Sequence, residues 1–299
     1  MFNRILVPLD GSHLAEAVLP SVAFLSKKLG STIILIHVIE RNAPRSVHGD
    51  RHLTNTQEAE EYLTFIVKTY FSPQTTIECH VHTEEVENVA NSIVSHAGEF
   101  DSGLIVMCAH GNQGVHDWVV GSLPQQVINQ GKTPVLLMHP DECQEILDIK
   151  QILVALDGIS EHETGLPIVA RLAQALSASL RLLQVVPTLT TLKAEQSASG
   201  MLLPGATTAL LDMAETNAEQ HLEEHAAEWR AAGLTVSTKV ARGDPAPKVV
   251  EASKTADLIV LGTHGKAGIK AFWAGSVASK IIAHTHLPIL LIPVNVVVP

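Results

Sequence analysis

Two glycine-bearing loops in this chain contain residue types that could hold an anion, and they differ at their first position. GTHGKAGIKAFWAGS begins at Gly262, whereas CAHGNQGVHDWVVGS begins at Cys108. In the later loop, nine residues separate Gly265 from the pair Gly275 and Ser276. Glycine lets backbone N–H groups approach a ligand without a Cβ in the way. The later loop therefore predicts a site for phosphate.

The serine that ends this loop has the features of a helix cap. Ser276 directly precedes the apolar segment VASKIIAHT, where the first N–H groups of a helix would lack partners. A helix start of this kind favours anions, and Lys266 and Lys270 add positive charge nearby. The spacing matches neither a P-loop nor the GxGxxG of a dinucleotide fold.

A carboxylate belongs to the same candidate site. Asp157 ends the apolar strand pattern of QILVALDGIS, at the edge of the sheet where open α/β folds bind ligands. It could accept hydrogen bonds from a ribose or an adenine. Taken alone, Asp157 also fits an ordinary turn residue or helix cap, and Asp10 recurs at the matching place in the first half.

These loops belong to two copies of one domain. RILVPLDGS, from Arg4, returns as QILVALDGIS from Gln151, and GLIVMCAHG returns as DLIVLGTHG. Short β-branched runs alternate with amphipathic segments such as LPIVARLAQALSA, which predicts βαβ crossovers and parallel sheets. We expect an α/β fold with domains over residues 1–143 and 150–299.

The second copy predicts five strands, each followed by a helix or the chain end. They are expected at residues 151–157, 179–186, 234–241, 257–262 and 288–294. The connection from Pro187 to about Thr208 is longer than its counterpart and is expected to be a loop.

Composition narrows the class of protein. The chain has 299 residues, 46% of them hydrophobic, and a formal charge of −11, which argues against disorder and against non-specific binding to nucleic acid. Three cysteines give no disulfide framework, and the apolar runs are too short to cross a bilayer. No signal peptide is evident at the start of the sequence. These features predict a cytoplasmic protein that binds neither nucleic acid nor membrane.

The motif G-x2-G-x9-G-Ser, with ILVALDG and DLIVLG before it, closely resembles the universal stress protein family, and the two copies resemble its tandem members. The resemblance implies an ATP-binding stress-response regulator, with Mg²⁺ held through the phosphates. Ala155 and Asp157 would contact base and ribose, and Val185 would pack on adenine. The phosphates would be surrounded by Gly262, His264, Gly265, Gly275, Ser276 and Val277.

The resemblance also implies an architecture. Each doubly wound, five-stranded parallel sheet would have strand order 3-2-1-4-5, and the two domains would pair through their last strands about a pseudo-twofold axis. Because one chain then supplies both members of the pair, we expect a monomer or a loose homodimer. The protein partner is left open.

The first copy departs from the phosphate pattern. Cys108 replaces the first glycine, and Pro124 lacks an N–H near the start of the following helix. Asn112 and His116 replace the two lysines, while Asp117 adds negative charge. We therefore expect ATP mainly in the C-terminal domain. The alternative is a carrier or scaffold that uses the N-terminal domain for a different small molecule.

Two further interpretations concern catalysis and metals. The segment HLEEH, His221 to His225, matches the HxxEH of some zinc peptidases, but no third ligand is evident. No set of residues suited to phosphoryl transfer can be identified, so at most slow ATP hydrolysis is expected.

Two more histidine pairs are expected at the surface. His80 and His82 point the same way on a strand, and His48 and His52 would lie one turn apart if their segment were helical. The alternative for both pairs is adventitious binding of zinc or nickel.

Overall fold

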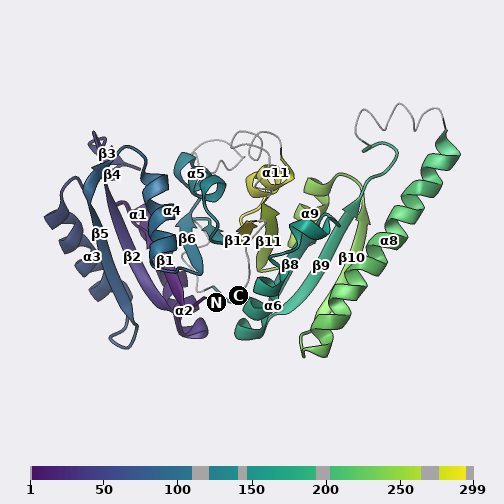
Figure 1. Ribbon diagram of the computed structural model, residues 1–299, viewed down its shortest axis with the longest axis horizontal. Helices are drawn as coiled ribbons and strands as arrows, with labels where there is room; N and C mark the ends of the chain where they lie inside the picture. The colour runs from purple at the N-terminus through teal and green to yellow at the C-terminus, as the bar shows by residue number, and fades with distance from the viewer. Residues whose placement is uncertain (1, 110–120, 141–146, 193–202, 264–275, 294–299) are drawn as a thin grey trace.

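The computed structural model describes residues 2–109, 121–140, 147–192, 203–263 and 276–293. They form a ten-stranded sheet with helices on both faces, and a separate two-stranded hairpin (Figure 1). The N-terminal half contains β1 (Arg4–Pro8), α1 (His13–Glu16), α2 (Leu19–Leu29), β2 (Thr32–Glu40), β3 (Ser46–Val47), β4 (Asp50–Arg51), α3 (Thr56–Tyr70), β5 (Ile77–Val86), α4 (Val89–Glu99), β6 (Leu104–Cys108), α5 (Ser122–Gln130) and β7 (Val135–Met138).

The C-terminal half repeats this order. It contains β8 (Gln151–Leu156), the short 3₁₀ helix η2 (Ser160–His162), α6 (Leu166–Leu176), β9 (Ser179–Val186), α8 (Pro204–Ala231), β10 (Val236–Arg242), α9 (Pro245–Ser253), β11 (Leu258–Thr263), α11 (Val277–Ala283) and β12 (Ile289–Pro293). The predicted strands of this half are found, with ends shifted by a residue or two.

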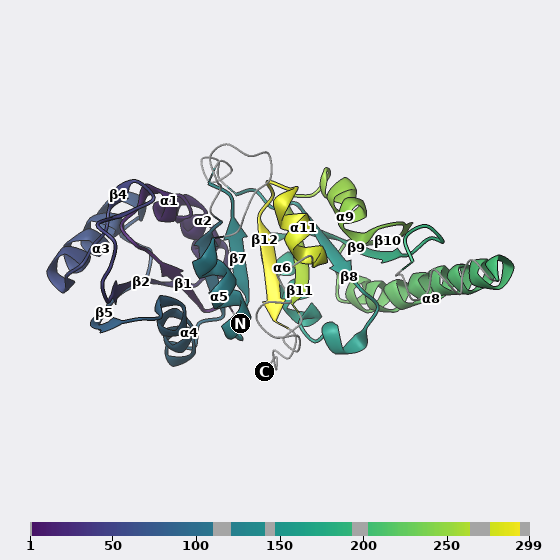
Figure 2. The same cartoon turned by 90° about the horizontal axis from the view of Figure 1, so that it is seen from above.

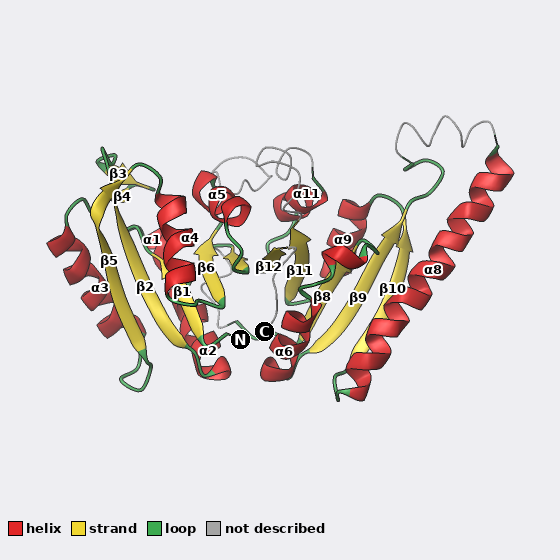
Figure 3. Cartoon of the chain, in the orientation of Figure 1, coloured by secondary structure: helices red, strands yellow, loops and turns green. Residues whose placement is uncertain are grey.

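The strand order confirms the expected topology. It runs β10-β9-β8-β11-β12-β7-β6-β1-β2-β5, so each half has the order 3-2-1-4-5 (Figure 3). Pairing is parallel within each half, whereas β12 and β7 pair antiparallel at the centre. Equivalent last strands that meet antiparallel are what a pseudo-twofold axis between the halves requires. The sheet is therefore continuous through the whole chain.

Two layers of helices cover the sheet (Figure 2). The core on one face gathers buried residues of α2, α3, α6 and α8, and the core on the other gathers those of α4, α5, α9 and α11. Each core includes residues from both halves. Strand β2 shows why the sheet is central, because its residues from Ile33 to Ile39 are all buried, as in a strand covered on both faces.

The repeated Leu-Asp-Gly sequence has a backbone cause. Gly11 and Gly158 follow the first strand of each half with φ of +90° and +75°. L-residues rarely adopt such angles, so glycine is required where the chain turns from strand to helix.

Two local expectations were wrong. Helix α8 begins at Pro204, so the long connection ends earlier than Thr208, because proline fits the first turn of a helix. His52 is buried, with 7% of its area exposed, rather than at the surface, and the segment that carries it and His48 is not helical. His48 and Gly49 form the turn between β3 and β4 with positive φ angles, as in tight hairpins.

Among the described helices, none is both long enough and apolar enough to cross a membrane.

Candidate functional site

A cavity of about 310 Å³ opens at the carboxyl ends of β8, β9 and β11. Its walls come from the ends of these strands and from the first turns of α6, α9 and α11. They are mostly aliphatic, including Val154, Leu183, Val249 and Ile281. Polar groups gather at one side, where Asp157, His162 and Glu163 follow β8.

The topology explains why the sheet opens here. Strand β8 lies between β9 and β11. The chain leaves β8 toward α6 on one face and leaves β11 toward α11 on the other. At such a switch point two connections diverge and leave a crevice outside the strand ends.

Asp157 is held by local contacts. One carboxylate oxygen accepts the N–H of Ile159 at 3.1 Å, and the other lies 2.6 Å from Nδ1 of His162. The side chain of Asp157 remains 40% exposed and lines the cavity. It thus acts as a turn residue and also presents a carboxylate to the cavity.

Ser276 caps α11, as its position predicts. Its backbone is extended, with φ −68° and ψ 157°, and its hydroxyl accepts the N–H of Ser279 at 3.1 Å. In the N-terminal half, Gly121 is the cap of α5, with no side-chain capping bond. Ser122 is therefore the first residue of its helix rather than the cap.

The structure brings six of the nine candidate residues together. The cavity is lined by Ala155, Asp157, Val185, Gly262, Ser276 and Val277. The other three, His264, Gly265 and Gly275, lie outside the described residues. Sequence reasoning did not identify His162, Glu163 or Pro245, which also line this cavity. His162 and Glu163 follow LDG in an ordinary polar turn, so their types alone gave no signal.

The N-terminal half has a cavity at the matching place, of about 420 Å³. Cys108, in the position of Gly262, lines it with only 6% of its surface exposed. His37, His48 and His52 also line it. His37 is almost fully buried, its Nδ1 lies 2.7 Å from the Leu9 carbonyl, and burial lowers its pKa below the ordinary value. The two cavities share a place in the fold but differ in chemistry.

Comparison with known proteins supports both halves of this description. The family model described as the universal stress protein family matches residues 1–139 and, separately, 148–293. The chain belongs to the universal stress protein family. Its two matches, together with the repeated strand order, give the tandem arrangement of that family.

Similarity to individual family members is partial. The chain is 27% identical over 198 residues to the universal stress protein Rv2005c of Mycobacterium tuberculosis, which covers 64% of this chain and 62% of that protein. It is 34% identical over 139 residues to Sll1654 of Synechocystis, covering 46% of this chain and 86% of that one. The match to MJ0531 of Methanocaldococcus jannaschii, 40% identical, spans only 24% of this chain and 41% of that relative.

A solved universal stress protein from Archaeoglobus fulgidus shares the fold over the full length. Its TM-score is 0.71 at 18% identity, with 99% of this chain and 100% of that chain covered. The tandem universal stress protein architecture therefore extends over both halves of the sheet.

In the folded chain, the HLEEH segment contacts a residue that sequence reasoning did not connect with it. Nε2 of His221 and Nε2 of His225 on α8 lie 3.1 and 3.0 Å from the same oxygen of Glu163. The Glu163 side chain is only 6% exposed, and its other oxygen has no hydrogen-bond partner among the described residues. Glu163 is therefore a candidate third ligand for HLEEH that was not evident from the sequence.

Proposed function

We propose that this universal stress protein binds ATP, with Mg²⁺ on the phosphates, in the C-terminal cavity. The observation that carries the proposal is that six residues, predicted from the sequence through its resemblance to the family, line one cavity at the switch point of the sheet. Aliphatic walls suit a purine face, and Asp157 suits the hydroxyls of a ribose. The phosphates would extend toward Ser276 and the glycine loop.

We propose that the nucleotide is a regulatory ligand rather than a fast substrate. Phosphoryl transfer needs a group that positions water and a positive group at the transferred phosphate. The described cavity walls offer two carboxylates and one imidazole, in Asp157, Glu163 and His162, and no lysine or arginine. Occupancy would then alter a surface that a protein partner recognises under stress, with hydrolysis at most slow.

Calorimetric titration with ATP and Mg²⁺ tests the proposal. Asp157→Ala should weaken binding by about 10-fold or more, because hydrogen bonds to a charged group contribute about 1.5–3 kcal/mol. Asp10→Ala is the matched control, since Asp10 lines the other cavity and should leave affinity unchanged. Thermal unfolding of both variants shows whether either change has damaged the fold. Absence of ATP binding by the wild type, or equal loss in both variants, would overturn the proposal.

The carrier interpretation has its own observation, the larger N-terminal cavity. Its described lining includes Asp10, Glu40 and Glu87 and a buried Cys108, a set that disfavours phosphate. In the carrier interpretation, the N-terminal cavity would hold a small molecule that is not a nucleotide. Native mass spectrometry of the purified protein distinguishes the ATP-binding interpretation from the carrier interpretation. Each predicts a retained ligand of a different mass, and each predicts that substitutions in a different cavity remove that ligand.

The contact between Glu163 and HLEEH supports a third candidate, a metal-dependent hydrolase. Two imidazoles and one carboxylate form a ligand set used by catalytic zinc. That function predicts stoichiometric zinc that is lost in His221→Ala together with hydrolytic activity. Hydrolytic activity that does not depend on zinc would exclude this function.

A further inference from the structure

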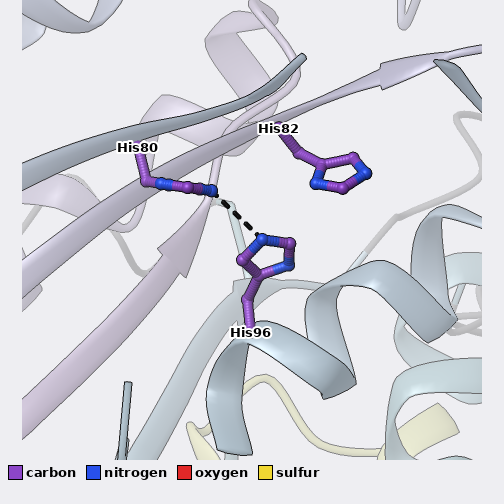
Figure 4. Close-up of side chains that lie close together, drawn as sticks. All are labelled: His80, His82 and His96. Carbon is purple, nitrogen blue, oxygen red and sulfur yellow. Dashed lines mark hydrogen bonds between the residues drawn. The ribbon is translucent and has the colours of Figure 1, made fainter. Parts of the chain in front are cut away.

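Three histidines of the N-terminal half converge between β5 and α4 (Figure 4). His80 and His82 are two residues apart on β5, so their side chains point to the same side of the strand. Val81, between them, belongs to the opposite core, whereas Val86 belongs to the core formed with α4. His96 comes from the last turns of α4. One ring nitrogen from each residue lies within 4.8 Å of the other two.

The ring of His96 is oriented as a ligand would be. Its Nδ1 lies 2.7 Å from the backbone carbonyl of Ser92. Because a carbonyl can only accept, Nδ1 donates to it, and Nε2 is the ring nitrogen that remains for a metal ion. That Nε2 faces the cluster, 3.1 Å from Nε2 of His80. Metal-binding histidines are usually fixed in this way, by a hydrogen bond from the other ring nitrogen.

The surroundings of the three histidines favour a bound cation. Burial, followed by the neighbouring His96, lowers the pKa of His80 below the ordinary value. Glu99 on α4 lies 4.0 Å from Nε2 of His96. A carboxylate beside three imidazoles creates a place where a cation is stabilised.

The distances fit a small divalent ion. Two nitrogens bound to one tetrahedral zinc lie about 3.3 Å apart, from Zn–N bonds of about 2.0–2.1 Å. The His80–His96 separation of 3.1 Å is close to that value. His82 is half-buried, its ring centroid lies 5.0 Å from that of His96, and its ring would turn on binding to bring a nitrogen to the ion.

We propose that His80, His82 and His96 bind one divalent cation of the zinc class, with a fourth position open to water. Imidazole ligands favour zinc, nickel or copper over magnesium or calcium. The bound ion would link the edge strand β5 to α4, and so stabilise the end of the N-terminal half. This site is independent of the candidate ATP cavity, which lies in the other half.

The test uses Zn²⁺ in competition with a chromophoric chelator. His221→Ala serves as the background, since it breaks the second group of described residues close enough to hold a metal ion, Glu163, His221 and His225. In that background we expect one Zn²⁺ per chain. Adding His82→Ala should weaken binding by more than about 10-fold. Adding His13→Ala, an exposed histidine on α1, should leave binding unchanged.

A second measurement separates loss of a ligand from loss of the fold. Saturating Zn²⁺ should raise the unfolding midpoint of the background variant by roughly 5 °C, and His82→Ala should abolish that rise while keeping the metal-free midpoint. His96→Gln should also abolish it. Zinc binding that persists in both variants, or that is already absent in the His221→Ala background, overturns the proposal.

Discussion

Gly165 lies where the first helix of the C-terminal half meets its last strand. A Cβ built at this position would stand 2.3 Å from Cγ2 of Ile292, a buried residue of β12. The close approach allows α6 to begin at the edge of the candidate cavity, which both residues line. The size of one side chain thus determines how closely a helix approaches the sheet.

Gly165→Ala should therefore lower the free energy of unfolding by about 1–3 kcal/mol, because an added methyl group overpacks a rigid contact. Gly98→Ala is the control, since a Cβ at that exposed helical position meets nothing within 4 Å and should be neutral or slightly stabilising. Urea unfolding measures both. Combining Gly165→Ala with Ile292→Ala should cost less than the two separate losses together, and simple additivity would contradict the contact.

His80 should make stability depend on pH. Its pKa is lowered in the folded protein, chiefly by burial and then by His96, so the unfolded chain binds more protons below pH 6.5. Stability should fall as pH drops through 6.5 toward the lower folded-state pKa. The titratable groups that act on the ring are His82 from β5, and His96 and Glu99 from α4.

The measurement is urea unfolding between pH 7.5 and 5.5 with metal removed by a chelator. His80→Gln should reduce the slope of stability against pH in this window. The buried His37 has a shift of the same sign, so part of the slope should remain. An unchanged slope in His80→Gln would show that the ring titrates normally in the folded state.

At the scale of elements, the two glycine loops lead into helices that begin differently. Ser276 caps α11 through Ser279, while the matching Ser122 is the first residue of α5 and makes no capping bond. The duplicated sequence Gly-Ser therefore has two local structures. The helix that borders the proposed nucleotide site is the one whose start is fixed by a side chain.

Ser276→Ala should cost about 1 kcal/mol of stability, the usual effect of losing an N-cap. Ser122→Ala should be nearly neutral, because no described capping bond is lost. Paired thermal unfolding measurements test this difference. Equal effects of the two substitutions would mean that the caps are equivalent in solution.

At the scale of the whole molecule, the two halves share one sheet. Leu290 of β12 pairs with Leu136 of β7, and both side chains belong to the core that extends across the junction. The last strands therefore pair with each other inside the chain, and the open edges of the sheet are β5 and β10.

Leu136→Ala and Leu290→Ala, one from each half, should each lower the free energy of unfolding by about 2–5 kcal/mol, as buried leucines do. Because the core is shared, both should shift the same single transition in calorimetry. Two separate transitions, each sensitive to only one of the variants, would mean that the halves unfold independently.

The amino-acid sequence by itself determined the duplication, the strands of each half and the Leu-Asp-Gly turns. These depend on periodicity, on turn chemistry and on spacing along a short stretch of chain. Six residues of the C-terminal cavity were predicted through the resemblance to a family, whereas His162, Glu163 and Pro245 were not predicted. Only the tertiary structure decided which distant side chains meet. Glu163 reaches His225 across 62 residues, and His80 reaches His96 across 16, because packing places α8 beside the β8–α6 turn and α4 against β5. Local sequence patterns do not predict such contacts, because the contacts depend on the order of the strands and on which face of the sheet each helix covers.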